Sequence, residues 1–221
     1  MGSSTTTSPA SCITTSPSNS SLGLDLVSWF GNYTSLAISF QGTKNGNTSN
    51  LDFSYTIAYK SPTTYKVNLN IVLKGKSRDY TLWDFRNGTV LALLAPGGKN
   101  STGSAASNTV FGFFSGLETL DTIALQSNNA AYFHSTGTST VTIGSNSFTV
   151  TNYAIITTPE TIPGCGGSGS ATLSTYTASL GTPSGSSFEL VVSATFVGSF
   201  TDASGTTTVN YTYQITALTV A

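Results

Sequence analysis

Apolar residues that recur at every second position are the feature that most constrains how this chain folds. In the segment TYKVNLNIVLK, residues 64–74, one face carries Tyr, Val, Leu, Ile and Leu, and the other carries Lys and Asn. A period of two places successive side chains on opposite faces of a β-strand. Strands with one apolar and one polar face are typical of antiparallel sheets, so this segment predicts a half-buried antiparallel strand.

The same alternation recurs along the chain. In LDFSYTIAYK one face carries Phe53, Tyr55, Ile57 and Tyr59, and the short connections KSPTT, KGKS and RNGT then predict a four-stranded meander over residues 50–95. Further strands are predicted at STVTI, SFTVTNYAIIT, ATLSTYTASL, SFELVVSATFVGSF and the C-terminal segment. We therefore predict an all-β antiparallel fold, sandwich or jelly-roll-like, with about 10–12 strands.

Helical periodicity is predicted near residues 115–127, SGLETLDTIALQS, where Ser115 and Glu118 form a capping box. Residues 1–21 are Ser/Thr-rich and predict an extended N-terminal tail. Residues 22–221 are expected to form a single β-sandwich domain, with a sub-boundary at 157–170 as the alternative. A small β domain after that boundary would be marginally stable alone, which favours one continuous domain.

The surface predicted for this domain is polar but nearly uncharged. Charged residues make up 8% of the chain and Ser with Thr about a third, while ten Tyr and twelve Phe argue against disorder. This composition is typical of exported β proteins, so an extracellular or cell-surface location is expected, with any export signal already removed or replaced. No apolar run is long enough for a transmembrane helix.

N-x-Ser/Thr acceptor sequences for N-linked glycans add to this expectation. They occur at Asn19, Asn32, Asn47, Asn87, Asn100 and Asn210. Asn47 and Asn100 fall in predicted loops and Asn210 on the polar face of the last strand, whereas Asn87 is also part of an Asn-Gly hairpin signal.

Two cysteines, Cys12 and Cys165, have no second cysteine or histidine at metal-ligand spacing. We expect them to form a disulfide between the tail and the loop around residue 165, with two free thiols as the alternative. No metal and no cofactor are predicted.

Chemical motifs for catalysis or nucleic-acid binding are sparse. His134 stands alone, and Asp79 and Asp84 are five residues apart on a predicted strand, which places them on opposite faces. The basic residues around the meander alternate with tyrosines assigned to the apolar face, which disfavours a nucleic-acid surface. We therefore predict that the chain is not an enzyme and does not bind nucleic acid. Trp83 and Phe85 share a strand face and are candidates for stacking on a sugar, or else core residues.

The charges are divided along the chain. All eight basic residues precede residue 100, where four acids accompany them, whereas five acids and no base follow. Such a division favours attraction of a polyanion or head-to-tail self-association, or else forms two solvated faces of one domain.

The last strand changes phase near its end. Val209, Tyr213 and Ile215 lie on one face, but from Ala217 on the apolar positions are Leu218 and Val220. This phase change predicts either a β-bulge or a closing stretch that buries itself against a second surface, such as another subunit, which would make Leu218 and Val220 an assembly strand.

A Ser/Thr-rich leader, many acceptor sequences, scarce charge and the ending YQITALTVA together resemble exported surface proteins of thermoacidophilic archaea. More narrowly, the chain is similar to the all-β subunits of their thread filaments. The resemblance implies that an N-terminal tail supplies a strand to the next subunit and that glycans coat the outside. Our leading expectation is thus a glycosylated structural subunit of a surface filament or coat, with copies of itself as partners. The alternatives are a secreted sugar- or lipid-binding module around Trp83 and a virion coat protein.

Overall fold

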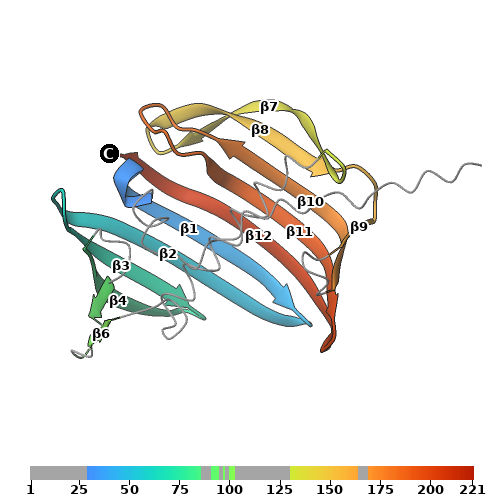
Figure 1. Ribbon diagram of the computed structural model, residues 1–221, viewed down its shortest axis with the longest axis horizontal. Helices are drawn as coiled ribbons and strands as arrows, with labels where there is room; N and C mark the ends of the chain where they lie inside the picture. Colours follow the sequence, from blue (N-terminus) through green and yellow to red (C-terminus); the bar gives the residue numbers. More distant parts are fainter. Residues whose placement is uncertain (1–28, 86–90, 95–96, 98–99, 103–129, 164–168) are drawn as a thin grey trace, which may run out of the picture.

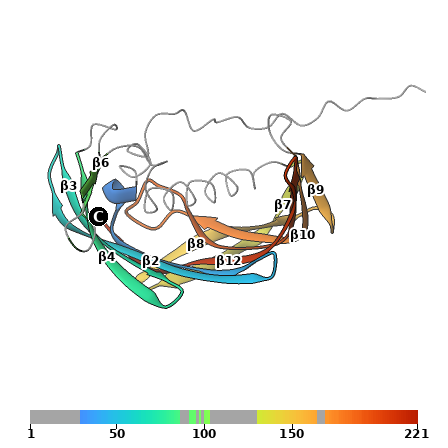
Figure 2. The same ribbon diagram turned by 90° about the horizontal axis from the view of Figure 1, so that it is seen from below.

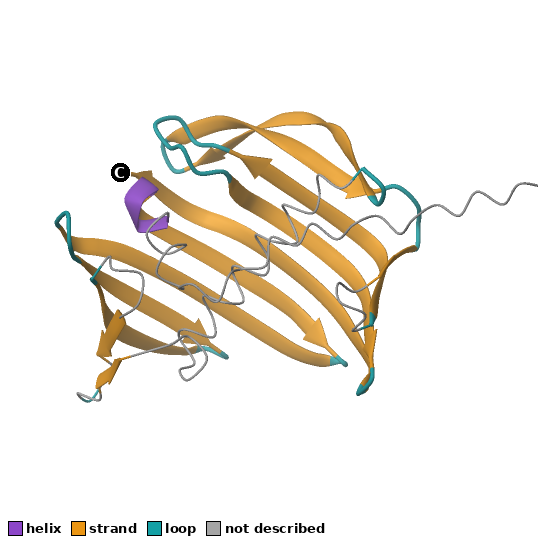
Figure 3. Ribbon diagram, viewed as in Figure 1, coloured by secondary structure: helices purple, strands orange, loops and turns teal. Residues whose placement is uncertain are grey.

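The computed structural model describes residues 29–85, 91–94, 97, 100–102, 130–163 and 169–221. Within these residues the chain is almost entirely antiparallel β-sheet, which confirms the predicted all-β fold (Figures 1 and 3). The strands are β1 (Tyr33–Lys44), β2 (Asn47–Lys60), β3 (Tyr65–Leu73), β4 (Lys76–Asp84), β5 (Leu91–Leu94), β6 (Asn100–Thr102), β7 (Phe133–Ile143), β8 (Asn146–Ile155), β9 (Glu160–Pro163), β10 (Ser170–Gly181), β11 (Leu190–Asp202) and β12 (Gly205–Val220).

All twelve strands belong to one hydrogen-bonded sheet. Its order is β6-β5-β4-β3-β2-β1-β12-β11-β10-β8-β7, and β9 pairs with the start of β10. The meander predicted from the alternation is present as the consecutive neighbours β2, β3, β4 and β5. The sandwich-like packing takes the form of a single sheet that curves into an open trough, whose two ends rise on the same side (Figure 2).

The two halves of the sequence are also the two halves of the sheet. Strands β1–β6 form one side and β7–β12 the other, and they meet where β1 pairs with β12. Across this seam Ile38 lies opposite Ile215 and Phe40 opposite Tyr213. The first described strand is therefore paired with the last, which places the seam in the middle of the sheet (Figure 1).

The sheet has an inner face, which lines the trough, and an outer face. Inner-face side chains are mostly apolar and buried, as Leu36, Ile38, Phe53, Val67 and Ile215 show with 2% exposure or less. Outer-face positions alternate with them, and many carry hydroxyl or amide groups. One outer row crosses five strands and consists of Ser39, Gln214, Ser193, Ser179 and Asn152.

A single helical turn, residues 29–32, closes one end of the inner face. Phe30 is fully buried, and its ring makes an edge contact with the ring of Tyr55 at a centroid distance of 4.9 Å. The Tyr33 hydroxyl donates to the carbonyl oxygen of Phe188 at 2.7 Å, which ties the loop between β10 and β11 to this turn. The core thus joins residues more than 150 positions apart in sequence.

Several predicted features lie outside the described residues. These are the tail 1–21, the helix near 115–127, and both cysteines. Of the segment 157–170, residues 160–163 and 170 take part in the sheet through the pairing of β9 with β10. Among the described residues, no helix has the length and apolar character needed to cross a membrane.

Candidate functional site

Strand β7 forms one edge of the sheet. It is 11 residues long and pairs with β8 on one side, and no described strand pairs with its other side. A register shift between Ser135 and Gly137, where Gly137 has a φ of 125°, interrupts its first part. The stretch 137–143 is regular, with exposed Thr138 and Thr140, and contains no proline and no charged residue. It therefore lacks the features that usually prevent an edge strand from pairing with another chain, apart from the bulge at its start.

The division of charge along the sequence becomes a division across the sheet. The described basic residues lie on β1–β4 or their turns, whereas Glu160, Glu189 and Asp202 lie in the half that contains β7. Within the described part of that second half there is no lysine or arginine. The free edge of β7 thus belongs to the acidic side of the sheet.

The acceptor sequences are distributed unevenly over the structure. Asn210 and Thr212 are exposed on the outer face of β12, and Asn47 is exposed at the start of β2. The Asn32 side-chain oxygen accepts hydrogen bonds from the backbone N–H of Ser187 at 3.0 Å and from its hydroxyl at 3.1 Å. Asn19, Asn87 and the side chain of Asn100 lie outside the described residues. Asn47 and Asn210 are therefore the acceptors with accessible side chains in the described part.

The phase change in the last strand is a β-bulge. Ala37 pairs with Ala217 and Ile38 with Ile215, so Thr216 is the extra residue. Leu218 is 5% exposed and Val220 pairs with Tyr33 of the same chain. β1 of the same chain thus pairs with one side of this stretch, and the described ladder with β11 on the other side ends at Gln214. An assembly role of Leu218 and Val220 stays a prediction.

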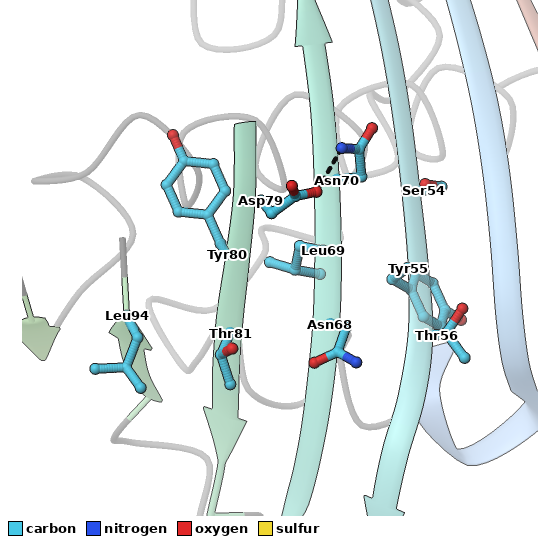
Figure 4. Close-up of a pocket in the computed structure, with 10 residues that line it drawn as sticks. All are labelled: Ser54, Tyr55, Thr56, Asn68, Leu69, Asn70, Asp79, Tyr80, Thr81 and Leu94. Atoms are coloured by element: carbon cyan, nitrogen blue, oxygen red, sulfur yellow. Dashed lines mark hydrogen bonds between the residues drawn. The ribbon is translucent and has the colours of Figure 1, made fainter. Parts of the chain in front are cut away.

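A recess lies on the outer face of the meander (Figure 4). We call it the meander recess; its volume is about 540 Å³ and it is lined by Ser54, Tyr55, Thr56, Asn68, Leu69, Asn70, Asp79, Tyr80, Thr81 and Leu94. The outer-face members form two cross-strand rows, Ser54–Asn70–Asp79 and Thr56–Asn68–Thr81–Leu94. The Asn70 amide nitrogen donates to the Asp79 carboxylate at 2.6 Å and to the Ser77 hydroxyl at 2.7 Å. These bonds hold Asn70 and Asp79 in fixed orientations at one end of the recess.

A third row with two aromatic side chains continues this surface. Tyr59 pairs with Lys66, and Lys66 pairs with Trp83. The Lys66 ammonium lies 5.6 Å from the centroid of the Trp83 ring, and Tyr59 is 54% exposed. The alternation placed Tyr59 with the apolar face, but a register shift between Ile57 and Tyr59 leaves Ala58 as an extra residue and turns Tyr59 to the outer face. Sequence reasoning missed this position because the bulge leaves no mark in the pattern of residue types.

The remaining sequence candidates do not converge on a catalytic arrangement. Asp79 is exposed while Asp84 is 1% exposed, which confirms that the two carboxylates lie on opposite faces. His134 is exposed on β7, and Phe85 is 39% exposed directly after β4. Within the described residues no group of three His, Cys, Asp or Glu side chains is arranged to hold a metal ion.

The buried hydroxyl of Tyr55 has a structural role. Burial is the main cause that raises the pKa of Tyr55, with the neighbouring Tyr33 adding to it. The Tyr55 hydroxyl therefore stays protonated and lies 3.1 Å from the carbonyl oxygen of Tyr33. It serves to fasten β2 to the start of β1.

No protein-family model matches the chain, and no curated protein is similar to it at a significant level. Among solved structures, the chain is similar to MucB in complex with MucA(peri), with 12% identity, 90% of this chain and 54% of that chain covered, and a TM-score of 0.35. A second match is the MucA/MucB complex of Pseudomonas aeruginosa, at 12% identity, 90% and 56% coverage, and a TM-score of 0.36. The chain spans little more than half the length of these structures, and TM-scores this low carry no argument about fold or function.

Proposed function

We propose that this protein is a structural subunit of an extracellular filament or coat, and that copies join by strand addition at β7. The observation that supports the proposal best is the regular stretch 137–143 at the edge of the sheet. Unpaired N–H and C=O groups along such an edge pair with an extended segment of another chain, and the main-chain hydrogen bonds supply the affinity.

The partner of β7 is proposed to be an extended segment from the basic half of another copy. Contact between unlike surfaces of successive copies is heterologous and generates open fibres rather than closed dimers. The opposite charges of the two halves favour this head-to-tail arrangement over pairing of two β7 strands, which would bring two acidic sides together.

The exposed polar surface supports a location outside the cell. Many outer-face side chains carry hydroxyl or amide groups, Asn210 is an exposed glycan acceptor on this face, and Asn47 is an exposed acceptor at the start of β2. We propose that N-linked glycans at these residues coat the assembled surface. Glycopeptide mass spectrometry of native material would show this, and the absence of glycans from both residues would contradict it.

The edge proposal is tested with charge on β7. Lysines on an edge strand oppose pairing by their charge and by their need for water, so T138K combined with T140K is expected to prevent assembly. Sedimentation and electron microscopy should find monomers where the unaltered chain forms polymers.

The matched control places the same two substitutions on an interior strand. Thr175 and Thr177 are exposed on β10, which lies between β11 and the pair β8 and β9. T175K with T177K adds the same charge to the same half of the sheet and is expected to leave assembly unchanged. Equal assembly by both variants would rule out β7 as the joining strand.

A further inference from the structure

We infer that the outer face of β2–β4 binds a neutral oligosaccharide, held by the meander recess and by the aromatic row next to it. This site is separate from the edge of β7, and the inference does not rest on the assembly proposal. Three rows of side chains on neighbouring strands make up this face.

The three rows form one continuous surface. Along each strand, outer-face residues are separated by two positions, a spacing of roughly 6.8 Å. On β4 the succession is Asp79, Thr81 and Trp83, and across β3 it is Asn70, Asn68 and Lys66. The surface therefore passes from a carboxylate and amides, through hydroxyls, to aromatic rings.

The two polar rows offer both donors and acceptors. Amide and hydroxyl side chains each donate and accept hydrogen bonds, as the hydroxyl groups of a sugar do. The side chains of Thr56, Asn68 and Thr81 make no hydrogen bond to another side chain among the described residues. Asn70 and Asp79 are in contrast held by their mutual bond, so the ligand meets a fixed pair at one end and free groups in the middle.

The aromatic row offers a surface for the apolar face of a sugar ring. Aromatic side chains provide large apolar area with a defined orientation. Tyr59 is the more accessible of the two rings, because its side chain is 54% exposed and Lys66 lies over Trp83. Tyr59 is therefore the stacking residue, and Trp83 supports Lys66 beside it.

The charge of the recess selects among ligand classes. Asp79 is the charged residue that lines the recess and Lys66 lies in the aromatic row beside it, so the two unlike charges give the surface no net charge that would select an anion. One carboxylate without a second ligand of this kind nearby is insufficient for a divalent cation. A neutral polyhydroxylated chain satisfies the donors and acceptors without leaving a charge unpaired.

The size of the recess agrees with this ligand class. A volume of about 540 Å³ lies within the range of roughly 300–1,000 Å³ that small-molecule sites occupy. A free oligosaccharide and a glycan on a neighbouring copy present the same chemistry to it. The experiment therefore includes both sources.

The test is titration calorimetry on the intact chain with three neutral hexasaccharides, maltohexaose, cellohexaose and mannohexaose. Hexagalacturonate serves as the anionic counterpart, and glycans released from native protein form a separate arm. At least one neutral probe is expected to bind, and hexagalacturonate to bind more weakly or not at all.

Variants locate the binding within the surface. Y59A and N68A each remove one exposed contact and are expected to weaken binding of the neutral probe about tenfold. F200A is the matched control, because Phe200 is an exposed aromatic residue, 40% exposed, on β11 in the other half of the sheet. It should leave the affinity unchanged.

The calorimetry distinguishes results that support oligosaccharide binding from results that contradict it. Failure of the three neutral hexasaccharides and of the released glycans to bind, tighter binding of hexagalacturonate, or binding that Y59A and N68A leave unchanged would overturn the inference. Binding by the released glycans alone would support it and identify another copy as the source. The variant T138K/T140K should bind the neutral probe normally, so a failure of the assembly proposal is distinguishable from a failure of this one.

Discussion

Gly42 lies where two neighbouring strands approach too closely for a side chain. A Cβ at this position would meet the carbonyl oxygen and backbone of β12 at Asn210 and Tyr211. Gly198 on β11 is in the same situation against Thr172 of β10. Glycine at these inner-face positions permits the close backbone approach found in a strongly curved sheet.

Replacement of Gly42 should therefore destabilise the fold. G42A is expected to lower the free energy of unfolding by about 1–3 kcal/mol, because the added methyl group must displace backbone rather than a flexible side chain. Urea unfolding followed by tryptophan fluorescence measures the change. G31A is the control, since nothing lies within 4 Å of a Cβ there, and it should change stability by less than about 1 kcal/mol. Equal effects of the two substitutions would show that the close approach at Gly42 is unimportant.

In the turn between β11 and β12, the side chain of Asp202 stabilises the backbone. The Asp202 carboxylate accepts hydrogen bonds from the backbone N–H of Ser204 at 2.7 Å and from its hydroxyl at 2.5 Å. These bonds favour the ionised form and lower the pKa of Asp202 below its ordinary value. The side chain organises the turn residues before Gly205 and is exposed at the surface.

At the scale of elements, β12 is the strand on which the sheet depends most. It pairs with β1 on one side and β11 on the other, and its end packs Leu218 into the core. The bulge at Thr216 lets both Ile215 and Leu218 face inward although they are three residues apart. Without this extra residue one of the two would face the outer side.

This arrangement predicts that the end of β12 supports folding. L218A is expected to lower the free energy of unfolding by about 2–5 kcal/mol, as is usual when a buried leucine is truncated. T216A changes an exposed residue two positions before Leu218 and should stay within about 0.5 kcal/mol of the unaltered chain. Chemical denaturation of both variants as monomers measures the two changes in the free energy of unfolding. A stable L218A monomer that no longer assembles would instead favour a role of Leu218 between subunits.

At the scale of the whole molecule, the pairing of β1 with β12 turns a division in sequence into a division in space. Because the two halves carry opposite charge, the molecule has a basic and an acidic side. Long-range attraction between unlike sides increases the rate at which copies meet in the head-to-tail orientation.

The assembly rate should consequently depend on salt. Raising the ionic strength from about 0.01 M to 1 M shortens the screening length from roughly 30 Å to 3 Å, so the initial rate of polymer growth by light scattering is expected to fall several-fold. Monomer stability measured at both ionic strengths serves as the control. A growth rate that is independent of salt would contradict electrostatic guidance between the two sides.

In the meander, the alternation of residue types predicts the buried face of β3 correctly but not the face of Tyr59 on β2. Val67 and Leu69 alternate with Lys66 and Asn68, and the structure buries the first pair while leaving the second on the outer face. The alternation predicts the wrong face for Tyr59, because the bulge at Ala58 arises from the pairing of β2 with β3 and not from the local pattern. Of the two aromatic residues in the candidate sugar site, the sequence therefore indicated Trp83 but not Tyr59.

Most of the strands, the hairpins of the meander and a polar surface with few charges follow from the sequence alone, through a period of two, turn residues and composition, whereas β1 and β9 are not among the predicted strands. Only the tertiary structure decided that β1 pairs with β12, where Thr34 and Thr219 are 185 positions apart. It also decided that all described strands form one curved sheet, and that β7 is left at an edge. The physical reason is that alternation fixes which face of a strand is buried, whereas the choice of distant neighbours depends on packing of the whole inner face at once.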